Sequence, residues 1–360
     1  MHLAGTQKKY LHQWGDQVTH YTLGLFANMY PAYDGDWRGS FIRQMVRDLE
    51  TRGIAVKKAV KSSSSVIGYV PFYYQSMVLA RDTTPDILQA EYIPHSSLIP
   101  AYFRRQNVPL VLKFHGDDAR IYPFKNRFNM ALTHAMLKHA AHVVTASEEM
   151  RRVLIDIGGN PETISAIHTG VDTEFFSPGS KEQSRKSLGL PAEATIFLFV
   201  GRLHPSKGIN ELLKVARQCP DLLFIFVGSG RSVPVYPDNC RFVGEKIPEE
   251  VRTWMNAADC LVLPTHTEAV PTSVMEAFAC GIPAITTDVG GCPEIVEDGK
   301  NGLIVPVLDV KSLHDAVVWI HNNTESREEM GKQGRITVLE RYDHRILIEQ
   351  LINVHRLLIR

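Results

Sequence analysis

Two glutamates on either side of a predicted helix start are the residues in this sequence best placed to do chemistry. Glu268 and Glu276 are separated by seven residues that have the character of a loop end followed by a helix. Pro271 suits the first turn of a helix, and Thr272 or Ser273 can cap it, so we place Glu268 on the approach loop and Glu276 in the opening turn. A helix N-terminus attracts anions. Carboxylates beside it are therefore expected to hold hydroxyl groups while amides and cations hold the anion, an arrangement that suits a nucleotide sugar.

A simpler interpretation of the same residues is a capping box. In that arrangement the Glu276 side chain only accepts a hydrogen bond from the backbone N–H of Ser273. Capping boxes are common, so this interpretation is favoured when the segment is considered alone. The choice depends on the other residues that accompany the two glutamates.

A glycine-flanked basic loop supplies candidate anion ligands. The segment Gly201-Arg-Leu-His-Pro-Ser-Lys-Gly208 follows a predicted strand at Ile196–Val200 and precedes a predicted helix. Arg202 can grip a phosphate with two parallel hydrogen bonds, and Lys207 can act as a mobile positive charge. The alternative is an ordinary surface loop that happens to contain two basic residues.

Two further candidates come from the first half of the chain. Gly39 stands between a predicted strand and a predicted helix, where the missing Cβ lets the backbone approach a phosphate closely. His115 follows a predicted strand and could donate to a sugar hydroxyl or move a proton. The alternatives are a turn glycine and a structural histidine satisfied by a backbone carbonyl.

Motifs for several other kinds of site are missing. The acidic pairs Asp34-Gly-Asp36 and Asp117-Asp118 have no matching set of ligands nearby and resemble turn chemistry, so we predict no metal site and no cofactor. The sequence contains no G-x-G-x-x-G after its first strand, no P-loop and no G-x-S-x-G. Dinucleotide-binding, P-loop and serine-hydrolase interpretations therefore lose their main support.

Composition indicates a globular protein of ordinary two-domain size. The chain has 360 residues, of which 44% are hydrophobic and 22% charged, and it has no apolar run long enough to span a bilayer. Five cysteines without C-x-x-C spacing favour free thiols in a reducing compartment. The polar N-terminus lacks the apolar core of a signal peptide, so we predict a cytoplasmic protein.

Charge is distributed unevenly between the two halves. Residues 1–172 contain 19 Lys and Arg against 15 Asp and Glu, a net +4, which the rest of the chain balances. This excess is too small to predict nucleic-acid binding. It is compatible with peripheral contact with an anionic membrane surface, at the inner face of the membrane.

Apolar runs alternate with helical patterns along the whole chain, which is typical of βαβ units around parallel sheets. A break rich in Pro, Gly and Ser follows Asp172, after which the alternation resumes. The fold class predicted is therefore α/β, with two doubly wound domains in tandem. Strands are expected at Leu23–Met29, Ile87–Glu91, Leu110–Phe114, Val143–Ala146, Ile196–Val200, Leu222–Val227, Cys260–Leu263 and Ala284–Thr287. The main helices are expected at Ser40–Thr51, Ser96–Arg105, Arg127–Ala140, Glu148–Ile155, Ile209–Arg217 and His344–Leu358.

Taken together, these motifs resemble the retaining glycosyltransferases of family 4, which have the GT-B fold. The resemblance covers most of the chain, and its specificity lies in the joint order and spacing of the motifs. Those motifs are Tyr30-Pro31 to Gly39-Ser-Phe41, His115-Gly-Asp-Asp118, Ala166 to Asp172, Val200-Gly-Arg-Leu203 with Lys207-Gly208, Glu268 to Glu276, Gly290-Gly291 and Glu294. Ala269-Val270, Thr169 and Ser40 depart from the usual family residues.

The resemblance implies a role for each candidate. Arg202, Lys207 and the Gly201 loop bind the donor diphosphate, and Gly39 closes over it. His115 and Glu268 contact the donor sugar. Glu276 holds the ribose hydroxyls, with the backbone of Ser273 and Val274 at the phosphates or the sugar.

The resemblance also implies an activity. It predicts metal-independent hexosyl transfer from a UDP-, GDP- or ADP-sugar to a glycan, lipid-linked or small-molecule acceptor, in polysaccharide, glycolipid or glycoconjugate biosynthesis. Predicted domains span 1–175, 176–342 and a helix at 343–360 that packs back on the first, with acceptor contacts from loops at Val66–Arg81 and Arg120–Arg127. The alternatives are a non-catalytic nucleotide-sugar binder in an assembly complex, and another GT-B enzyme such as an epimerase or an inverting transferase.

Overall fold

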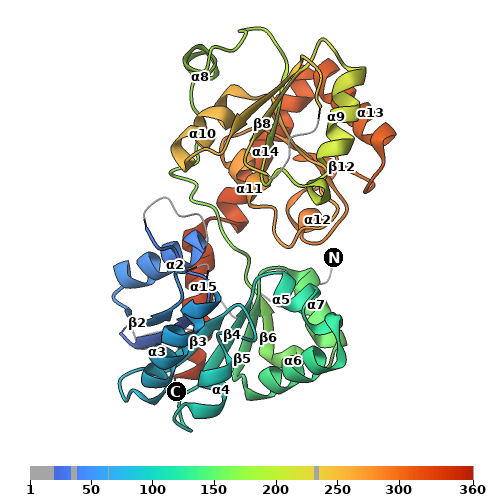
Figure 1. The fold of residues 1–360 in the computed structure, drawn as a ribbon. Helices are drawn as coiled ribbons and strands as arrows, with labels where there is room; N and C mark the ends of the chain where they lie inside the picture. Colours follow the sequence, from blue (N-terminus) through green and yellow to red (C-terminus); the bar gives the residue numbers. More distant parts are fainter. Residues whose placement is uncertain (1–19, 34–38, 64, 231–234, 360) are drawn as a thin grey trace. The chain divides into compact units, whose positions relative to one another are not determined.

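The computed structural model describes residues 20–33, 39–63, 65–230 and 235–359. Among these residues the strands form two sheets, and every pairing between strands for which a register is given is parallel. The chain divides into two compact units, one of residues 1–113, 130–143 and 348–360, and the other of residues 114–129 and 144–347. Figure 1 shows how helices accompany the strands throughout, as expected for βαβ connections.

The first sheet has the strand order β2-β1-β3-β4-β5-β6. Its strands are β1 (Thr22–Ala27), β2 (Ala55–Val60), β3 (Ile87–Glu91), β4 (Leu110–Phe114), β5 (His142–Thr145) and β6 (Ile164–Ala166). The helices between them are α2 (Ser40–Thr51), α3 (Tyr69–Arg81), α4 (Leu98–Phe103), α5 (Asp117–Arg120), α6 (Arg127–His139) and α7 (Glu148–Asp156). The central strands β3 and β4 are buried along their whole length, including the polar side chains of Gln89, Glu91 and Lys113.

The second sheet has the strand order β12-β11-β10-β7-β8-β9. Its strands are β7 (Ile196–Val200), β8 (Leu223–Val227), β9 (Cys240–Gly244), β10 (Cys260–Leu263), β11 (Ala284–Thr287) and β12 (Gly302–Val305). The helices of this part are α8 (Lys181–Ser187), α9 (Ile209–Gln218), α10 (Pro248–Ala257), α11 (Thr272–Ala279), α12 (Cys292–Ile295), α13 (Val310–Asn322) and α14 (Thr324–Arg341). The strand order reverses between β7 and β10, which are hydrogen-bonded neighbours. In sheets of this kind ligands bind at the carboxyl ends of the strands beside such a reversal.

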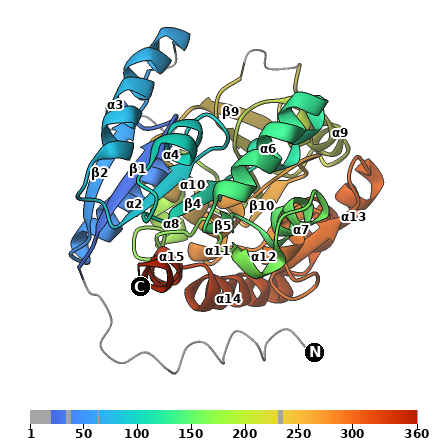
Figure 2. The ribbon, with the colours of Figure 1, turned by 90° about the horizontal axis from the view of Figure 1, so that it is seen from below.

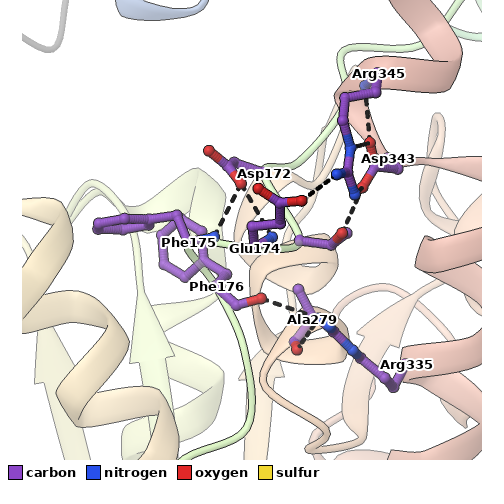
Figure 3. Close-up of polar contacts among 9 residues, drawn as sticks. Asp172, Glu174, Phe175, Phe176, Ala279, Arg335, Asp343 and Arg345 are labelled. Carbon is purple, nitrogen blue, oxygen red and sulfur yellow. Dashed lines mark hydrogen bonds and ion pairs between the residues drawn. The ribbon is translucent and has the colours of Figure 1, made fainter.

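The last helix, α15 (His344–Leu358), has its second part in the first compact unit. His355 is fully buried there, and its Nδ1 lies 2.8 Å from the Tyr21 hydroxyl. At the other end of α15, a polar cluster around buried Asp343 holds the connection to the preceding segments (Figure 3). Asp343 accepts hydrogen bonds from the Thr173 hydroxyl and from Arg345, whose Nη2 lies 2.8 Å away, while Arg335 donates to the Phe176 carbonyl at 3.0 Å.

The periodicity of the sequence predicted most of these elements correctly. The expected bounds of α2, β3, β4, β7, β10, β11 and α15 are those observed, and others differ at their ends by one or two residues. The prediction of a loop at Val66–Arg81 was wrong, since a short 3-10 helix η1 (Val66–Gly68) and α3 occupy it. Apolar residues on its exposed as well as its buried side hid the helical period there. Strands β2, β6, β9 and β12 were not predicted.

The five cysteines are free, as predicted, and all of them are buried. Within the described ranges no helix is both long and apolar enough to cross a bilayer. The predicted domain boundaries at residues 175 and 342 remain predictions.

Candidate functional site

Lys207 is placed by a close approach between two strand ends. After β7 the chain forms a short 3-10 helix, η4 (Pro205–Lys207), and then Gly208 with φ +74°. A Cβ on Gly208 would lie 1.8 Å from the carbonyl oxygen of Pro264, the residue that follows β10. Only glycine permits both this backbone conformation and this contact. Gly208 therefore holds Lys207 against the carboxyl end of β10.

Hydrogen bonds tie the same two loops together. The backbone N–H of His266 donates to the Ser206 carbonyl at 2.8 Å, and the Thr265 hydroxyl donates to the same oxygen at 3.2 Å. Thr287, at the end of β11, donates to the Thr265 carbonyl at 2.5 Å. Because these groups are largely buried, their geometry is enforced by the need to satisfy backbone polar atoms.

Lys207 and Glu268 form an ion pair, with Nζ and Oε2 2.5 Å apart and exposed side-chain fractions of 22% and 15%. An ammonium group has three donors, so this bond leaves Lys207 two for a ligand. The Glu268 backbone is fixed in turn by Gly290, whose φ is +54° and whose Cβ would lie 1.6 Å from the Glu268 carbonyl oxygen. The fold therefore brings together two of the predicted site residues, which are 61 positions apart in the sequence.

Arg202 shares the loop of Lys207 but is held differently. Gly201 donates its N–H to the Val227 carbonyl at 3.0 Å, which anchors the start of the loop to β8. The Arg202 side chain is exposed and has no hydrogen-bond or ion-pair partner among the described residues. Its guanidinium is therefore available to an anion that reaches the carboxyl end of β7.

Helix α11 does not begin as the sequence suggested. Pro271 is the N-cap rather than a first-turn residue, no side chain caps the helix, and Glu276 lies in its second turn. The Val274 N–H donates to the Pro271 carbonyl at 3.0 Å, whereas the Ser273 N–H has no acceptor in the described part of the chain. The capping-box interpretation is therefore wrong, because the N–H that Glu276 was to satisfy remains available, as an anion ligand requires.

Glu276 is half-buried on α11, and burial raises its pKa to about 8. Near neutral pH this carboxyl therefore carries a proton in the ligand-free protein. A protonated carboxyl both donates and accepts hydrogen bonds, so it can engage two neighbouring hydroxyl groups of a sugar.

Replacement of Glu276 by glutamine is expected to stabilise the protein at alkaline pH. The folded-state pKa is raised, so the wild type loses stability as the pH rises from the ordinary value of 4.5 to about 8. Glutamine carries no charge and avoids this loss. Thermal melting should show near-equal Tm values at about pH 5 and a gain of roughly 1 to 3 kcal/mol for Glu276→Gln above about pH 8. If the difference in stability between Glu276→Gln and wild type is the same at every pH, the pKa assigned to Glu276 is contradicted.

His115 belongs to a tight turn beside the Glu268 loop. The N–H groups of His115 and Gly116 both donate to Asp118 Oδ1, at 2.9 and 2.8 Å. A Cβ on Gly116 would lie 3.1 Å from the Cβ of Ala269, the neighbour of Glu268. Asp118 therefore stabilises a turn, which is the role that the sequence indicated as the alternative to metal binding. Asp34 and Asp36 lie outside the described residues.

Gly39 belongs to the other compact unit and begins α2 there. Its φ is +68°, and a Cβ would lie 2.5 Å from the Met29 carbonyl oxygen. Its carbonyl accepts the first helical hydrogen bonds, from Ile42 at 3.0 Å and Arg43 at 3.3 Å. This geometry explains the glycine by local structure, and its predicted role toward a phosphate stays a prediction.

Two charged residues that were not among the predicted catalytic or donor-binding residues lie near these loops. Glu294 accepts the N–H groups of Glu148 and Glu149, both at 2.9 Å, and also contacts His168 Nε2 at 2.8 Å. Burial acts to raise the pKa of Glu294, but these hydrogen bonds outweigh it and hold the pKa below its usual value. Glu294 therefore caps the N-terminus of α7 from about 145 positions away in sequence.

The second of these residues is Arg120. Its Nε lies 3.4 Å from Glu149, and its Nη1 lies 3.4 Å from the Cβ position of Gly290, which contacts Glu268. The sequence placed Glu294 among the family motifs and Arg120 in a predicted acceptor loop, but only the folded chain reveals these contacts. Within the described residues there is no group of three or more His, Cys, Asp and Glu side chains arranged to hold a metal ion.

The chain has two parallel sheets covered by helices, which is the architecture of the GT-B class of fold. In the second sheet, basic and acidic side chains lie at the carboxyl ends of the strands where the strand order reverses. Residues 7–175 match the family described as Glycosyltransferase Family 4, and residues 180–337 match Glycosyl transferases group 1. The chain belongs to this glycosyltransferase family.

Curated relatives support the same class. The chain is 28% identical to the glycosyltransferase TuaC of Bacillus subtilis, which is named provisionally for teichuronic acid biosynthesis, over 73% of this chain and 68% of that one. It is 32% identical to the D-inositol 3-phosphate glycosyltransferase of Corynebacterium glutamicum over 53% of this chain. That match spans about half, 51%, of the relative.

Solved structures share the fold at low sequence identity. Sucrose-phosphate synthase from Thermosynechococcus elongatus has a TM-score of 0.80 at 20% identity, covering 94% of this chain and 99% of that one. HepE of Anabaena, in complex with UDP and glucose, has a TM-score of 0.73 at 19% identity, covering 93% and 99%.

Proposed function

We propose that this protein transfers a hexosyl unit from a nucleoside-diphosphate sugar to an acceptor hydroxyl with retention at the anomeric carbon. The observation that carries this proposal is the meeting of Lys207 and Glu268 at the carboxyl ends of β7 and β10. One is a cation for a diphosphate and the other a carboxylate for sugar hydroxyls. The UDP and glucose bound by the structural relative HepE make UDP-sugars the first donors to test.

In the proposed step the bond between the anomeric carbon and the diphosphate oxygen breaks, and the acceptor oxygen bonds to that carbon from the same face. The acceptor proton passes to the departing phosphate oxygen. Arg202, Lys207 and the Ser273 N–H would stabilise the negative charge that develops on the leaving group. Glu276 would hold the ribose hydroxyls. His115 and Glu268 would contact the donor sugar.

The proposed biological setting is the synthesis of a polysaccharide, glycolipid or glycoconjugate in the cytoplasm. The relative TuaC, named for teichuronic acid biosynthesis, supports a polymeric or lipid-linked acceptor. A small soluble acceptor is the alternative within the same activity.

Isothermal titration with UDP and with GDP tests the donor site. Wild type should bind one of them, and Glu276→Ala should weaken that binding by about 10-fold or more, since a buried hydrogen-bond partner is worth roughly 1 to 3 kcal/mol. Glu340→Ala, an exposed carboxylate on α14, is the matched control and should bind as wild type does. Undiminished affinity in Glu276→Ala would refute the ribose assignment.

Product analysis tests the reaction itself. A screen of UDP-, GDP- and ADP-sugars should show nucleoside diphosphate release with one donor, and NMR of the product should show an anomeric proton of the donor's configuration. An inverted product would overturn retention. Binding without release for every donor and acceptor would favour a non-catalytic binder instead.

A further inference from the structure

Helix α3 and the short helix η1 before it present exposed apolar residues to solvent within the first compact unit. Val66, Ile67, Val70, Tyr74 and Val78 have exposed fractions of 81%, 78%, 72%, 72% and 56%. Positions 70, 74 and 78 are four residues apart, so they share one side of the helix. We call these five residues the α3 face. Figure 2 shows α3 in blue at the edge of its unit beside β2.

The opposite side of α3 accounts for its packing. Phe72, Ser76, Leu79 and Ala80 are buried, and α3 contacts β2 and α4 through this side. The packing of α3 in its unit therefore does not require the apolar residues of the α3 face. Single exposed apolar residues are normal, but three in one row on α3, preceded by two more in η1, mark an interaction surface.

Neither the α3 face nor the rest of α3 carries an acidic residue, and Asp82, which caps the end of α3, is paired with Lys57 at 2.7 Å. No Asp or Glu occurs between Glu50 and Asp82, or between Glu91 and Asp117. Arg81 ends α3 and lies over the ring of Phe103 on α4, with 5.9 Å between the guanidinium carbon and the ring centroid. Phe103 is 45% exposed and is followed by Arg104 and Arg105. None of these three arginines has a carboxylate partner among the described residues.

We propose that the α3 face docks on an anionic lipid bilayer. One side of α3 carries aliphatic side chains and a tyrosine, the helix ends at Arg81, and no carboxylate lies within it. These features are typical of a helix that lies in the plane of a membrane interface. Tyrosine places its ring among the acyl chains and its hydroxyl among headgroups. The surface would hold the protein where lipid-linked acceptors reside, but the inference does not depend on sugar transfer.

Vesicle co-sedimentation tests this docking with the full chain. Wild type should sediment with phosphatidylcholine vesicles that contain phosphatidylglycerol, more weakly with phosphatidylcholine alone, and less at high salt because ions screen the arginines. Val70→Glu should lower the partition coefficient about tenfold, by adding a negative charge and removing apolar area. Arg81→Gln should lower it about fivefold, and only on the anionic vesicles.

Val235→Glu is the matched control, since Val235 is 88% exposed in the other compact unit. It should bind vesicles as wild type does. Equal losses in Val70→Glu and Val235→Glu, or wild type that stays in solution with both lipid mixtures, would overturn the proposal. So would a dimer that Val70→Glu dissociates without changing vesicle binding, because a second copy would then cover the face. Circular dichroism and nucleotide titration establish that each variant is folded.

Discussion

Replacement of Lys207 by alanine is expected to lower the rate of sugar transfer by about 10² to 10³. Loss of one group that stabilises developing charge in a water-poor site has this magnitude. The change also leaves Glu268, only 15% exposed, without its ion-pair partner, so negative charge would face the diphosphate. Steady-state kinetics with the active donor should show most of the loss in kcat, since the leaving charge is largest in the transition state.

Lys300→Ala is the control for this experiment. Lys300 forms a similar ion pair, with its Nζ 2.7 Å from Glu297 Oε2, at a more exposed position outside the loops of the site. It should leave kcat within about twofold, because exposed ion pairs contribute little. A second variant, Glu268→Gln, keeps the shape of the site while freeing Lys207. If Lys207→Ala and Lys300→Ala have equal activity, Lys207 has no part in the reaction.

Replacement of His355 by alanine is expected to reduce the free energy of unfolding by roughly 3 kcal/mol. The buried imidazole bridges the Tyr21 hydroxyl, 2.8 Å from Nδ1, and Gln89 Oε1, 2.7 Å from Nε2. Gln89 in turn donates to buried Glu91. Removal of the ring leaves two buried polar groups unsatisfied, opens a cavity and loosens α15 from the first sheet. Urea unfolding followed by tyrosine and tryptophan fluorescence measures the effect.

The effect of His355→Ala should also depend on pH. Burial lowers the pKa of His355 to about 3, so the folded protein binds fewer protons than the unfolded chain between that value and 6.5. Wild type therefore loses stability as the pH falls through this window, whereas the alanine variant lacks this contribution. The difference between them should be about 2 kcal/mol smaller near pH 5 than near pH 7.5. His314→Ala, at a partly exposed position on α13 beside Asp315, is the control and should change the stability and its pH dependence far less.

The sequence identified most of the elements that carry the site. Strands β7 and β10 and helix α9 follow from apolar runs and helical spacing, which are local properties of the chain. Helix α3 escaped the same reasoning because its stripe of exposed apolar residues obscures the alternation of buried and exposed positions. The edge strand β9 was missed because Arg241 interrupts its apolar run, and β12 because its run of Leu303 to Val305 is short.

The start of α11 shows the limit of local patterns. Ser273 and Glu276 have the spacing of a capping box, yet the backbone of Pro271 to Val274 takes a course in which that bond is not made. Several cap geometries are compatible with the same residues, and they differ by about 1 kcal/mol. Tertiary contacts of the Glu268 loop with Gly290 and Gly291 decide among them.

By itself, the sequence determined the alternation of strands and helices, the family, and the types of side chain that the site contains. These three properties depend on hydrophobic periodicity and on short motifs, both of which are set by residues close together in the sequence. The tertiary structure alone decided that Lys207 meets Glu268, that Glu294 caps α7, and that His355 is buried between Tyr21 and Gln89. Each of these contacts joins positions between 61 and 334 residues apart, and close packing of the whole chain, rather than any local preference, sets such distances.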